Sequence, residues 1–157
     1  MNVSAPIVSP ENALAACAEL THPLVFTNGC FDILHRGHIN YLFAARELGE
    51  SLVVALNTDA SVHRLGKAIN RPLNPLEARV EIIAALRCVD LVTWFDQDTP
   101  EEVINLINPQ VLVKGGDWPA NKIVGADHVL SSGGTVHSIP FKYHTSTTGL
   151  IEKIKNS

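Results

Sequence analysis

The feature that most constrains this chain lies near its start, where an apolar run, a polar turn and an amphipathic segment follow one another. The run covers residues 23–26, the turn covers residues 27–38, and the amphipathic segment covers residues 39–49 and ends in glycine. This order predicts a buried strand, a turn and a helix. In a parallel sheet, such a unit places backbone N–H groups and the positive end of a helix dipole where a phosphate can bind.

The rest of the chain alternates in the same way between apolar runs and helix signals. Further strands are predicted at residues 51–57, 89–95, 111–114 and 135–139. Helices are expected over residues 12–20, within residues 120–132 and over residues 146–155. Three more are expected: one begins at residue 59, one begins at residue 74 and one ends at residue 107. Caps are expected at Ser9, Asn74 and Thr99. We therefore expect an α/β fold, a Rossmann-like, doubly wound, mostly parallel five-stranded sheet with helices on both faces.

Length and the lack of any repeat or linker predict a single domain over residues 1–157. Within it, residues 1–22 form a helical extension ahead of the first strand. The sequence leaves open whether that helix packs on the sheet or on a partner subunit.

Composition narrows the class of protein. A formal net charge of −4 with no basic stripe argues against a nucleic-acid partner. The three cysteines are odd in number and widely spaced, which predicts reduced thiols and a cytoplasmic location. No apolar run reaches the roughly 20 residues that cross a bilayer, and the start of the chain lacks the pattern of a signal peptide. We expect no membrane partner.

Two histidines, His35 and His38, stand three residues apart at the predicted start of the helix after the glycine turn. Both can face one bound group, and imidazoles at a helix N-terminus can donate to phosphoryl oxygens. A zinc site is the competing interpretation, but no third ligand or Cys-x-x-Cys motif completes it, so we expect no protein-held metal. Gly29, in the same turn as Asn28 and Asp32, is expected to let the backbone approach a ligand.

Three cations follow the second predicted strand. Lys67 and Arg71 lie in a polar loop, where the plain alternative is a solvated charge. Arg79 lies beside the buried stripe of the next helix, and a guanidinium there requires an anion. That anion is either a glutamate in a structural salt bridge or a phosphate of the ligand.

Two later segments carry the remaining candidates. The loop at the end of the fourth predicted strand contains Lys114, two glycines, Asp117 for a sugar hydroxyl, and Trp118, which either flanks a base or packs. A hydroxyl run, Ser146 to Thr148, precedes the last helix. One hydroxyl suffices as a cap, whereas a run of them suits a polyphosphate.

These residues resemble the signature of a known family. Thr27, Gly29, Phe31, Asp32, His35, Gly37 and His38 match the H-x-G-H signature of the cytidylyltransferase-like nucleotidyltransferases, and residues 146–148 resemble their S-T-T signature. The segments at 71–74, 89–90, 99–100, 111–117 and 123–126 are similar to one branch, the D-glycero-β-D-manno-heptose 1-phosphate adenylyltransferases. Thr145 departs from that pattern, in which an aromatic or aliphatic residue precedes the S-T-T signature.

The resemblance implies an enzyme that transfers the adenylyl group of ATP to the heptose 1-phosphate, giving ADP-heptose and pyrophosphate for lipopolysaccharide cores. It implies direct in-line attack, Mg²⁺ as the cofactor, a homodimer, and a stand-alone form without the sugar kinase to which this domain is often fused. The expected catalytic residues are His35, His38, Lys67 and Arg79. The expected nucleotide-binding residues are Asn28, Gly29, Cys30, Phe31, Asp32, Gly37, Lys114, Gly116, Asp117, Ser146, Thr147 and Thr148. The expected acceptor-binding residues are Asn57, Arg71 and Trp118.

Three alternatives remain open at this stage. The first is a CTP-dependent enzyme acting on glycerol 3-phosphate or a similar phospho-alcohol. The second is a nucleotide-binding module without turnover. A dinucleotide-dependent oxidoreductase fits less well, because the G-x-G-x-x-G fingerprint is absent and Asn57 stands where an acidic residue would end the second strand.

Overall fold

The architecture is an open, wholly parallel sheet. A computed structural model describes residues 4–66, 70–143 and 146–157. Its strands are β1 (Leu24–Gly29), β2 (Ser51–Asn57), β3 (Leu91–Phe95), β4 (Val111–Gly115) and β5 (Thr135–Ile139). They lie in the order β3-β2-β1-β4-β5, and every pairing is parallel. The chain therefore winds outward from β1 to β3 and then returns to place β4 beside β1, which makes β1/β4 the topological switch point.

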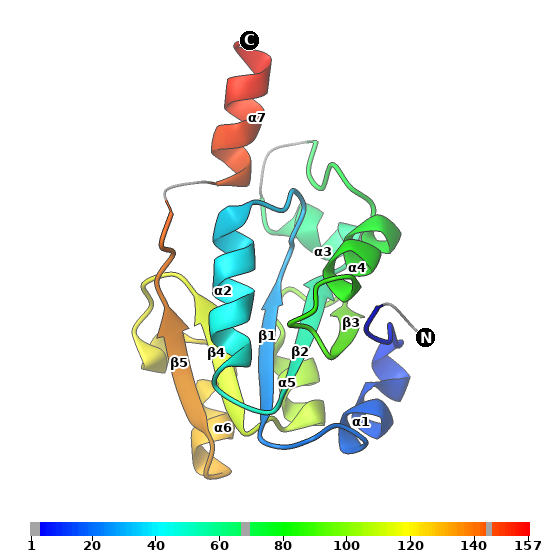
Figure 1. Ribbon diagram of the computed structural model, residues 1–157, viewed down its shortest axis with the longest axis vertical. Helices are drawn as coiled ribbons and strands as arrows, with labels where there is room; N and C mark the ends of the chain where they lie inside the picture. The colour runs from blue at the N-terminus through cyan, green and yellow to red at the C-terminus, as the bar shows by residue number, and fades with distance from the viewer. Residues whose placement is uncertain (1–3, 67–69, 144–145) are drawn as a thin grey trace.

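Helices cover both faces of this sheet (Figure 1). One face carries α2 (Arg36–Arg46) and α4 (Leu76–Ala84), and the other carries α1 (Pro10–Ala18), α5 (Glu101–Ile107) and α6 (Ala126–Ser131). The short α3 (Asp59–Arg64) and the 3₁₀ turn η1 (Ala120–Lys122) follow β2 and β4. The last helix, α7 (Thr147–Lys155), has no buried residue and projects beyond the carboxyl end of the sheet (Figure 1). The Rossmann-like, doubly wound prediction is confirmed.

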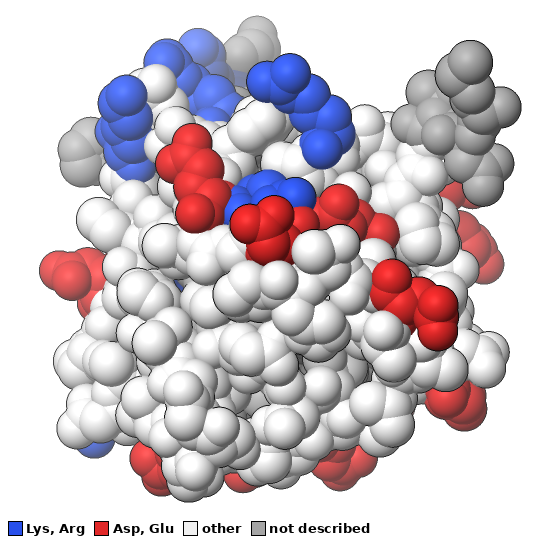
Figure 2. All heavy atoms as spheres, turned by 60° about the horizontal axis from the view of Figure 1, so that its bottom comes forward, with Lys and Arg blue, Asp and Glu red and all other residues white. Residues whose placement is uncertain are grey.

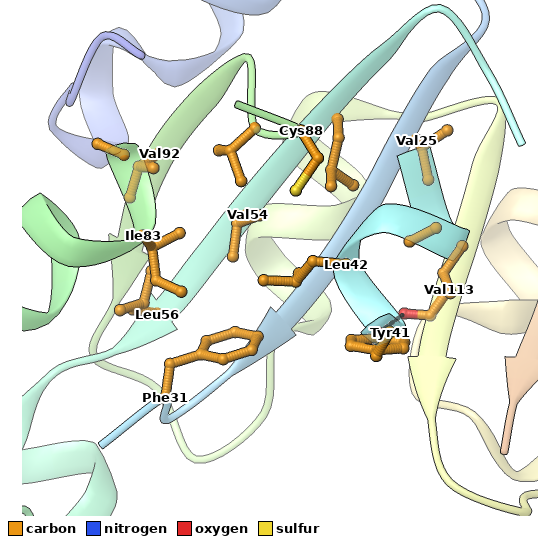
Figure 3. Packing of buried hydrophobic residues seen from close by; sticks show 14 of the residues in the cluster. Val25, Phe31, Tyr41, Leu42, Val54, Leu56, Ile83, Cys88, Val92 and Val113 are labelled. Atoms are coloured by element: carbon orange, nitrogen blue, oxygen red, sulfur yellow. Dashed lines mark hydrogen bonds between the residues drawn. The ribbon is translucent and has the colours of Figure 1, made fainter. Parts of the chain in front are cut away.

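Because both faces are covered, the central strands consist mainly of buried apolar residues, as their continuous runs predicted. Alternate residues serve opposite cores: Val25 and Val54 join the α2/α4 side, whereas Phe26 and Val53 join the α1/α5 side. Figure 3 shows the core on the α2/α4 side, in which Phe31 and Tyr41 lie at the end nearest the strand arrowheads. Phe31 and Tyr41 therefore belong to the core and also border the space beyond the carboxyl end of β1.

The N-terminal helix packs on the sheet, one of the two options left open by the sequence. Ala13 and Cys17 of α1 are buried in the second core, and the helix contacts β3 and α5. Ahead of it, Val8 N–H donates to the carbonyl of Val92 on β3 at 2.9 Å. No helix in the described ranges is both long enough and apolar enough to cross a bilayer.

Several predicted boundaries and caps need correction. The first strand does not end at Phe26 but runs on to Gly29, and α2 already begins at Arg36. The expected caps Asn74 and Thr99 do not act, because α4 and α5 have prolines at their N-cap positions and no side-chain cap hydrogen bond. Asn74 instead donates its amide to the carbonyl of Asp32 at 2.5 Å.

The predicted helical region 120–132 is two pieces, η1 and α6, separated at Gly125. Gly125 has φ +84°, and a Cβ there would lie 2.8 Å from Cδ1 of Ile104. Glycine is required for that backbone conformation and for the close packing on α5, so a continuous helix is excluded.

The core makes one stability prediction. Leu42 on α2 is fully buried against the sheet, so Leu42→Ala should lower the free energy of unfolding by about 2–5 kcal/mol in urea titrations. The control Leu130→Ala removes a half-exposed side chain and should change it by less than about 0.5 kcal/mol. Equal effects of the two variants would contradict the packing described here.

Candidate active site

A cavity opens at the switch point, beyond the carboxyl ends of β1 and β4. It has a volume of about 190 Å³. Its lining comes from the turn after β1, from α2, from the loop before α4, from β4, and from the chain on either side of residues 144–145. The lining residues are Asn28, Gly29, Cys30, Phe31, Asp32, His38, Tyr41, Arg71, Lys114, Gly115, Phe141 and Thr147. The tertiary structure thus brings predicted residues from five segments to one place.

The two histidines stack at the start of α2. Their ring centroids are 3.9 Å apart with an interplanar angle of 25°. His35 is the N-cap residue, and its Nδ1 accepts a hydrogen bond from Gly37 N–H at 3.1 Å. Partial burial lowers the pKa of His35 below its ordinary value, so the ring is neutral near pH 7 and carries its proton on Nε2. His35 therefore has a donor to offer an anion near the helix N-terminus.

The backbone of the turn adopts an uncommon conformation at Phe31, where φ is +46°. This puts the Phe31 ring into the core and edge-on to His38, with ring centroids 5.4 Å apart. A Cβ on Gly29 would lie 2.9 Å from Cε2 of that ring. Gly29 is therefore needed for the Phe31 ring, a different reason from the expected approach to a ligand, although Gly29 also lines the cavity.

Asp32 fastens the next loop to the turn. Its carboxylate pairs with the Arg71 guanidinium and accepts from the N–H groups of Leu73 and Asn74 at 2.8 and 2.9 Å. Burial opposes ionisation, but these donors outweigh it and hold the pKa of Asp32 below its usual value. Asp32 and Arg71 both line the cavity, and Arg71 is only 7% exposed.

Arg79 supports the same turn from behind. Its side chain is fully buried, and its nitrogens bond to Asp59, to the Asn74 carbonyl and to the Cys30 carbonyl at 2.6, 3.0 and 2.7 Å. This is the structural salt bridge that the sequence left as an alternative, with Asp59 in place of the expected glutamate. It corrects the expectation of a catalytic phosphate clamp, because no guanidinium surface remains for a ligand.

Asn57, expected to bind the acceptor, also lies behind the cavity. It is buried at the end of β2, donates to Ser61 Oγ at 2.9 Å and lies 3.7 Å from the Cys30 thiol, for which its Oδ1 is the acceptor. Because its side chain faces these groups, Asn57 positions Cys30 and does not border the cavity.

A second cavity, of about 230 Å³, lies next to the first and shares Asn28 and Lys114 with it. Its other lining residues are Pro100, Trp118, Lys122, Ile123 and Val124. The predicted residue Gly116, with φ +114°, leads the chain into this region. Asp117 is exposed and borders neither cavity.

The three hydroxyl residues Ser146, Thr147 and Thr148 lie in different surroundings. Ser146 caps α7 by accepting from Gly149 N–H at 3.0 Å, Thr147 lines the first cavity, and Thr148 is exposed. Thr147 also donates to the Ile33 carbonyl at 3.3 Å, which ties α7 to the turn. Lys67 lies outside the described residues.

The sequence interpretation missed two aromatic residues of the lining, Tyr41 and Phe141. Tyr41 stands one helical turn after His38, on the same face of α2, so that spacing was the available signal. Phe141 followed no recognisable pattern. In the described part of the chain, no group of three or more His, Cys, Asp or Glu side chains is arranged to hold a metal ion.

Comparisons with known proteins show what the chain is similar to. The profile of the family described as Cytidylyltransferase-like matches residues 26–148. The chain is 52% identical over 143 residues to a D-beta-D-heptose 1-phosphate adenylyltransferase of Bordetella bronchiseptica, covering 91% of this chain and 88% of that one. It is 50% identical to the bifunctional protein HldE of Marinomonas sp. over 97% of its own length, but it spans only 32% of that protein.

Solved structures give the same picture. A lipopolysaccharide core biosynthesis protein from Thermoplasma volcanium matches with a TM-score of 0.61 and 27% identity, over 78% of this chain and 98% of the other. A pantoate-beta-alanine ligase from Francisella tularensis matches with a TM-score of 0.63 over 98% of this chain and 74% of its own. At 13% identity the second match shows a shared fold alone.

The His35 cap predicts a pH dependence of stability. In the unfolded chain the imidazole gains a proton near pH 6.5, whereas in the folded chain it stays neutral to lower pH. The contribution of His35 to the free energy of unfolding should therefore be fully present above about pH 6.5. It should be lost as the pH falls from there through the lowered pKa of the folded state. His35→Asn keeps a capping oxygen without a titrating ring. Urea unfolding at pH 7.5 and 5.5 should show a smaller loss for this variant, and an identical loss would contradict the assignment.

Proposed function

The chain belongs to the cytidylyltransferase-like family, and we propose that it transfers the adenylyl group of ATP to D-glycero-β-D-manno-heptose 1-phosphate. The products would be ADP-heptose, for lipopolysaccharide core synthesis, and pyrophosphate. The observation that carries the proposal is the stacked pair His35 and His38 at the N-terminus of α2, beside a cavity that also contains Thr147. Donors from both ends of the chain thus converge where a triphosphate can bind.

The reaction is a direct displacement at the α-phosphorus of ATP. An oxygen of the acceptor phosphate forms the new P–O bond, and the bond to the departing pyrophosphate breaks with its electron pair. The protein contributes positioning and preorganised donors for the charge that develops on the phosphoryl oxygens. His38 and the Nε2–H of His35 would supply these donors, and the positive end of the α2 dipole would add to their effect. No covalent intermediate is needed, and the Cys30 thiol is held by Asn57.

Cations near the cavity would hold the phosphates. Lys114 ends β4 at the cavity, and Arg71 lies in its lining. We keep Lys67 as a predicted phosphate ligand. We also keep Asn28, Gly37, Gly116, Asp117, Ser146 and Thr148 as proposed nucleotide-binding residues, with Asp117 holding a sugar hydroxyl.

Mg²⁺ is the proposed cofactor, and when bound it would neutralise charge on the phosphates. The donor set of the cavity fits a cation that arrives with the triphosphate and keeps much of its water. Asp32, the carboxylate of the lining, is occupied by Arg71 and two backbone N–H groups. The homodimer also remains a proposal, to be tested by light scattering of the purified protein.

The experiment that tests the function measures pyrophosphate release. The protein, Mg²⁺ and each of ATP, CTP, GTP and UTP are incubated with the heptose 1-phosphate, other sugar 1-phosphates or glycerol 3-phosphate. Turnover should require ATP and the heptose 1-phosphate. Preference for CTP and glycerol 3-phosphate would replace the proposal by the cytidylyltransferase alternative. ATP binding without release in any combination would indicate a binding module.

The histidines make the sharpest catalytic prediction. His38→Ala should lower kcat by roughly a hundred- to a thousand-fold, the effect of removing one preorganised donor. Its circular dichroism spectrum and thermal unfolding should stay close to those of the parent. His128→Ala, on α6 and bonded to Asn108, is the matched control and should retain normal turnover. A His38→Ala enzyme of near-normal kcat would remove His38 from the catalytic residues.

A further inference from the structure

The second cavity opens from the same pair of strand ends as the first. Asn28, at the end of β1, and Lys114, at the end of β4, border both cavities. The histidines and Thr147 lie on the side of the first cavity, whereas η1 and the start of α5 lie on the side of the second. A group held between Asn28 and Lys114 can therefore be approached from two directions.

In-line displacement uses two such directions. The attacking oxygen and the leaving oxygen lie on opposite sides of the phosphorus in the transition state. The leaving pyrophosphate belongs with His35, His38 and the N-terminus of α2, which stabilise its charge. The acceptor phosphate must then arrive from the opposite side, and the second cavity, which meets the first at Asn28 and Lys114, offers an approach away from the histidines.

The lining of the second cavity suits a sugar. Trp118 is 51% exposed, so about half of its surface is not used in packing, and Pro100, Ile123 and Val124 add apolar surface to the cavity. Lys122 adds a cation and a donor for hydroxyl groups. Such a mixture of an aromatic face and a few polar groups is typical of sites for small polar ligands.

Trp118 is held in place by the loop that carries it. The backbone N–H of Trp118 donates to Ser138 Oγ on β5 at 3.0 Å, and the Ser138 hydroxyl donates to the Gly116 carbonyl at 2.5 Å. A Cβ on Gly116 would lie 2.7 Å from Trp118 Nε1, in addition to the strain of φ +114°. The glycine is thus required by the position of the indole, and the indole is positioned before any ligand binds.

We propose that the second cavity is the acceptor subsite, in which Trp118 stacks on the ring of the sugar 1-phosphate while its phosphate reaches between Asn28 and Lys114. The assignment rests on the proposed adenylyl transfer and adds to it the residue that selects a sugar over a smaller phospho-alcohol. Glycerol 3-phosphate has no ring to cover the indole, so Trp118 should contribute little to its binding.

Steady-state kinetics test this role. Trp118→Ala should raise KM for the heptose 1-phosphate by about tenfold or more and leave KM for ATP unchanged, whereas Trp118→Phe should keep most of the affinity. Trp94→Phe changes the other tryptophan, at the far edge strand β3, and serves as the control. A rise in KM for ATP instead would assign the indole to the base and overturn the subsite, with the adenylyl transfer itself intact.

Fluorescence gives a readout without turnover. In Trp94→Phe, Trp118 is the remaining tryptophan of the chain. With Mg²⁺ and a non-hydrolysable ATP analogue present, the heptose 1-phosphate should change its emission saturably. A saturable change with no pyrophosphate release from ATP would support the subsite while the proposed reaction fails. Normal release with no change in emission would overturn the subsite alone.

A different observation carries a second inference. The guanidinium carbon of Arg36, in the first turn of α2, lies 3.5 Å from the ring centroid of Tyr143. Two further contacts join the same regions: Phe141 packs edge-on against Tyr41 at 5.9 Å, and Thr147 donates to Ile33. The chain on both sides of residues 144–145 is thus fastened to α2 and to the turn before it.

We infer that Arg36 is a positioning residue, whose stack on Tyr143 keeps Phe141 and Thr147 against the nucleotide cavity. Arg36 is the variable residue of the H-x-G-H signature and does not border the cavity itself. Its effect would therefore reach the nucleotide through Tyr143. A cation–π contact at an exposed position corresponds to a change of about two- to fivefold in an equilibrium constant.

Alkaline titration of tyrosine absorbance at 295 nm reports this stack directly. The chain has two tyrosines, and burial raises the pKa of Tyr41 far above its usual value. A hydrogen bond from Arg36, with the charges of Arg36 and Lys142, lowers the pKa of Tyr143. The first transition should therefore belong to Tyr143, and Arg36→Ala should move it to higher pH.

The same variant should raise KM for ATP about two- to fivefold with little change in kcat. Arg36→Lys should recover part of this loss. Arg64→Ala, which removes an exposed arginine paired with Asp98 on the opposite edge, is the control. An unchanged KM for ATP in Arg36→Ala, with the tyrosine transition shifted, would show a stack that positions nothing and would overturn the inference.

Discussion

The buried turn after β1 is the constraint on which the rest of the site depends. Its polar backbone groups are removed from water and must find partners inside the protein. Arg79 donates a hydrogen bond to the Cys30 carbonyl, and the Asp32 carboxylate accepts from two backbone N–H groups of the loop that precedes α4. With the turn fixed on both sides, His35 falls at the N-cap of α2 and His38 one turn further on. A loosely held turn would leave the two imidazoles without a common direction.

The site attracts anions with few free charges. The Asp32 carboxylate and the buried Arg71 guanidinium neutralise one another, and the His35 ring is neutral near pH 7. Attraction for an anion would therefore come from Lys114, which lines the cavity, and from the positive end of the α2 dipole, which needs no counter-ion and does not reorganise during the reaction. Figure 2 shows the other end of the molecule, around the amino ends of the strands: its lower part is mostly uncharged, with Asp and Glu side chains at the edge, and a mixed group of basic and acidic side chains crosses the upper middle of the view. The polar machinery is concentrated at one end of the sheet.

Three glycines show how the wall of the site is shaped by side chains of the protein itself. Gly29 gives room to Phe31, Gly115 to Phe141, and Gly116 to Trp118. In each case a Cβ would lie within 3 Å of an aromatic ring. Phe31 and Phe141 line the first cavity, and Trp118 lines the second. A change in specificity within such a fold can therefore come from the loops after β4 and β5 without any change to the sheet.

The sequence alone determined the strands, the parallel α/β architecture and the two histidines, because apolar runs and glycine turns act locally and need no knowledge of distant residues. Only the tertiary structure decided which polar residues face a ligand. Arg79 and Asn57 carry groups that could bind a ligand, but both are buried and their side chains bond to the protein. Tyr41 and Phe141, which the sequence did not single out, line the cavity instead. The caps Asn74 and Thr99 failed for a related reason, since a local preference yields when a long-range partner such as Asp32 offers a better hydrogen bond or when proline takes the N-cap position. Whether a side chain is exposed to a cavity depends on contacts between segments far apart in the chain, and that information exists only once the chain has folded.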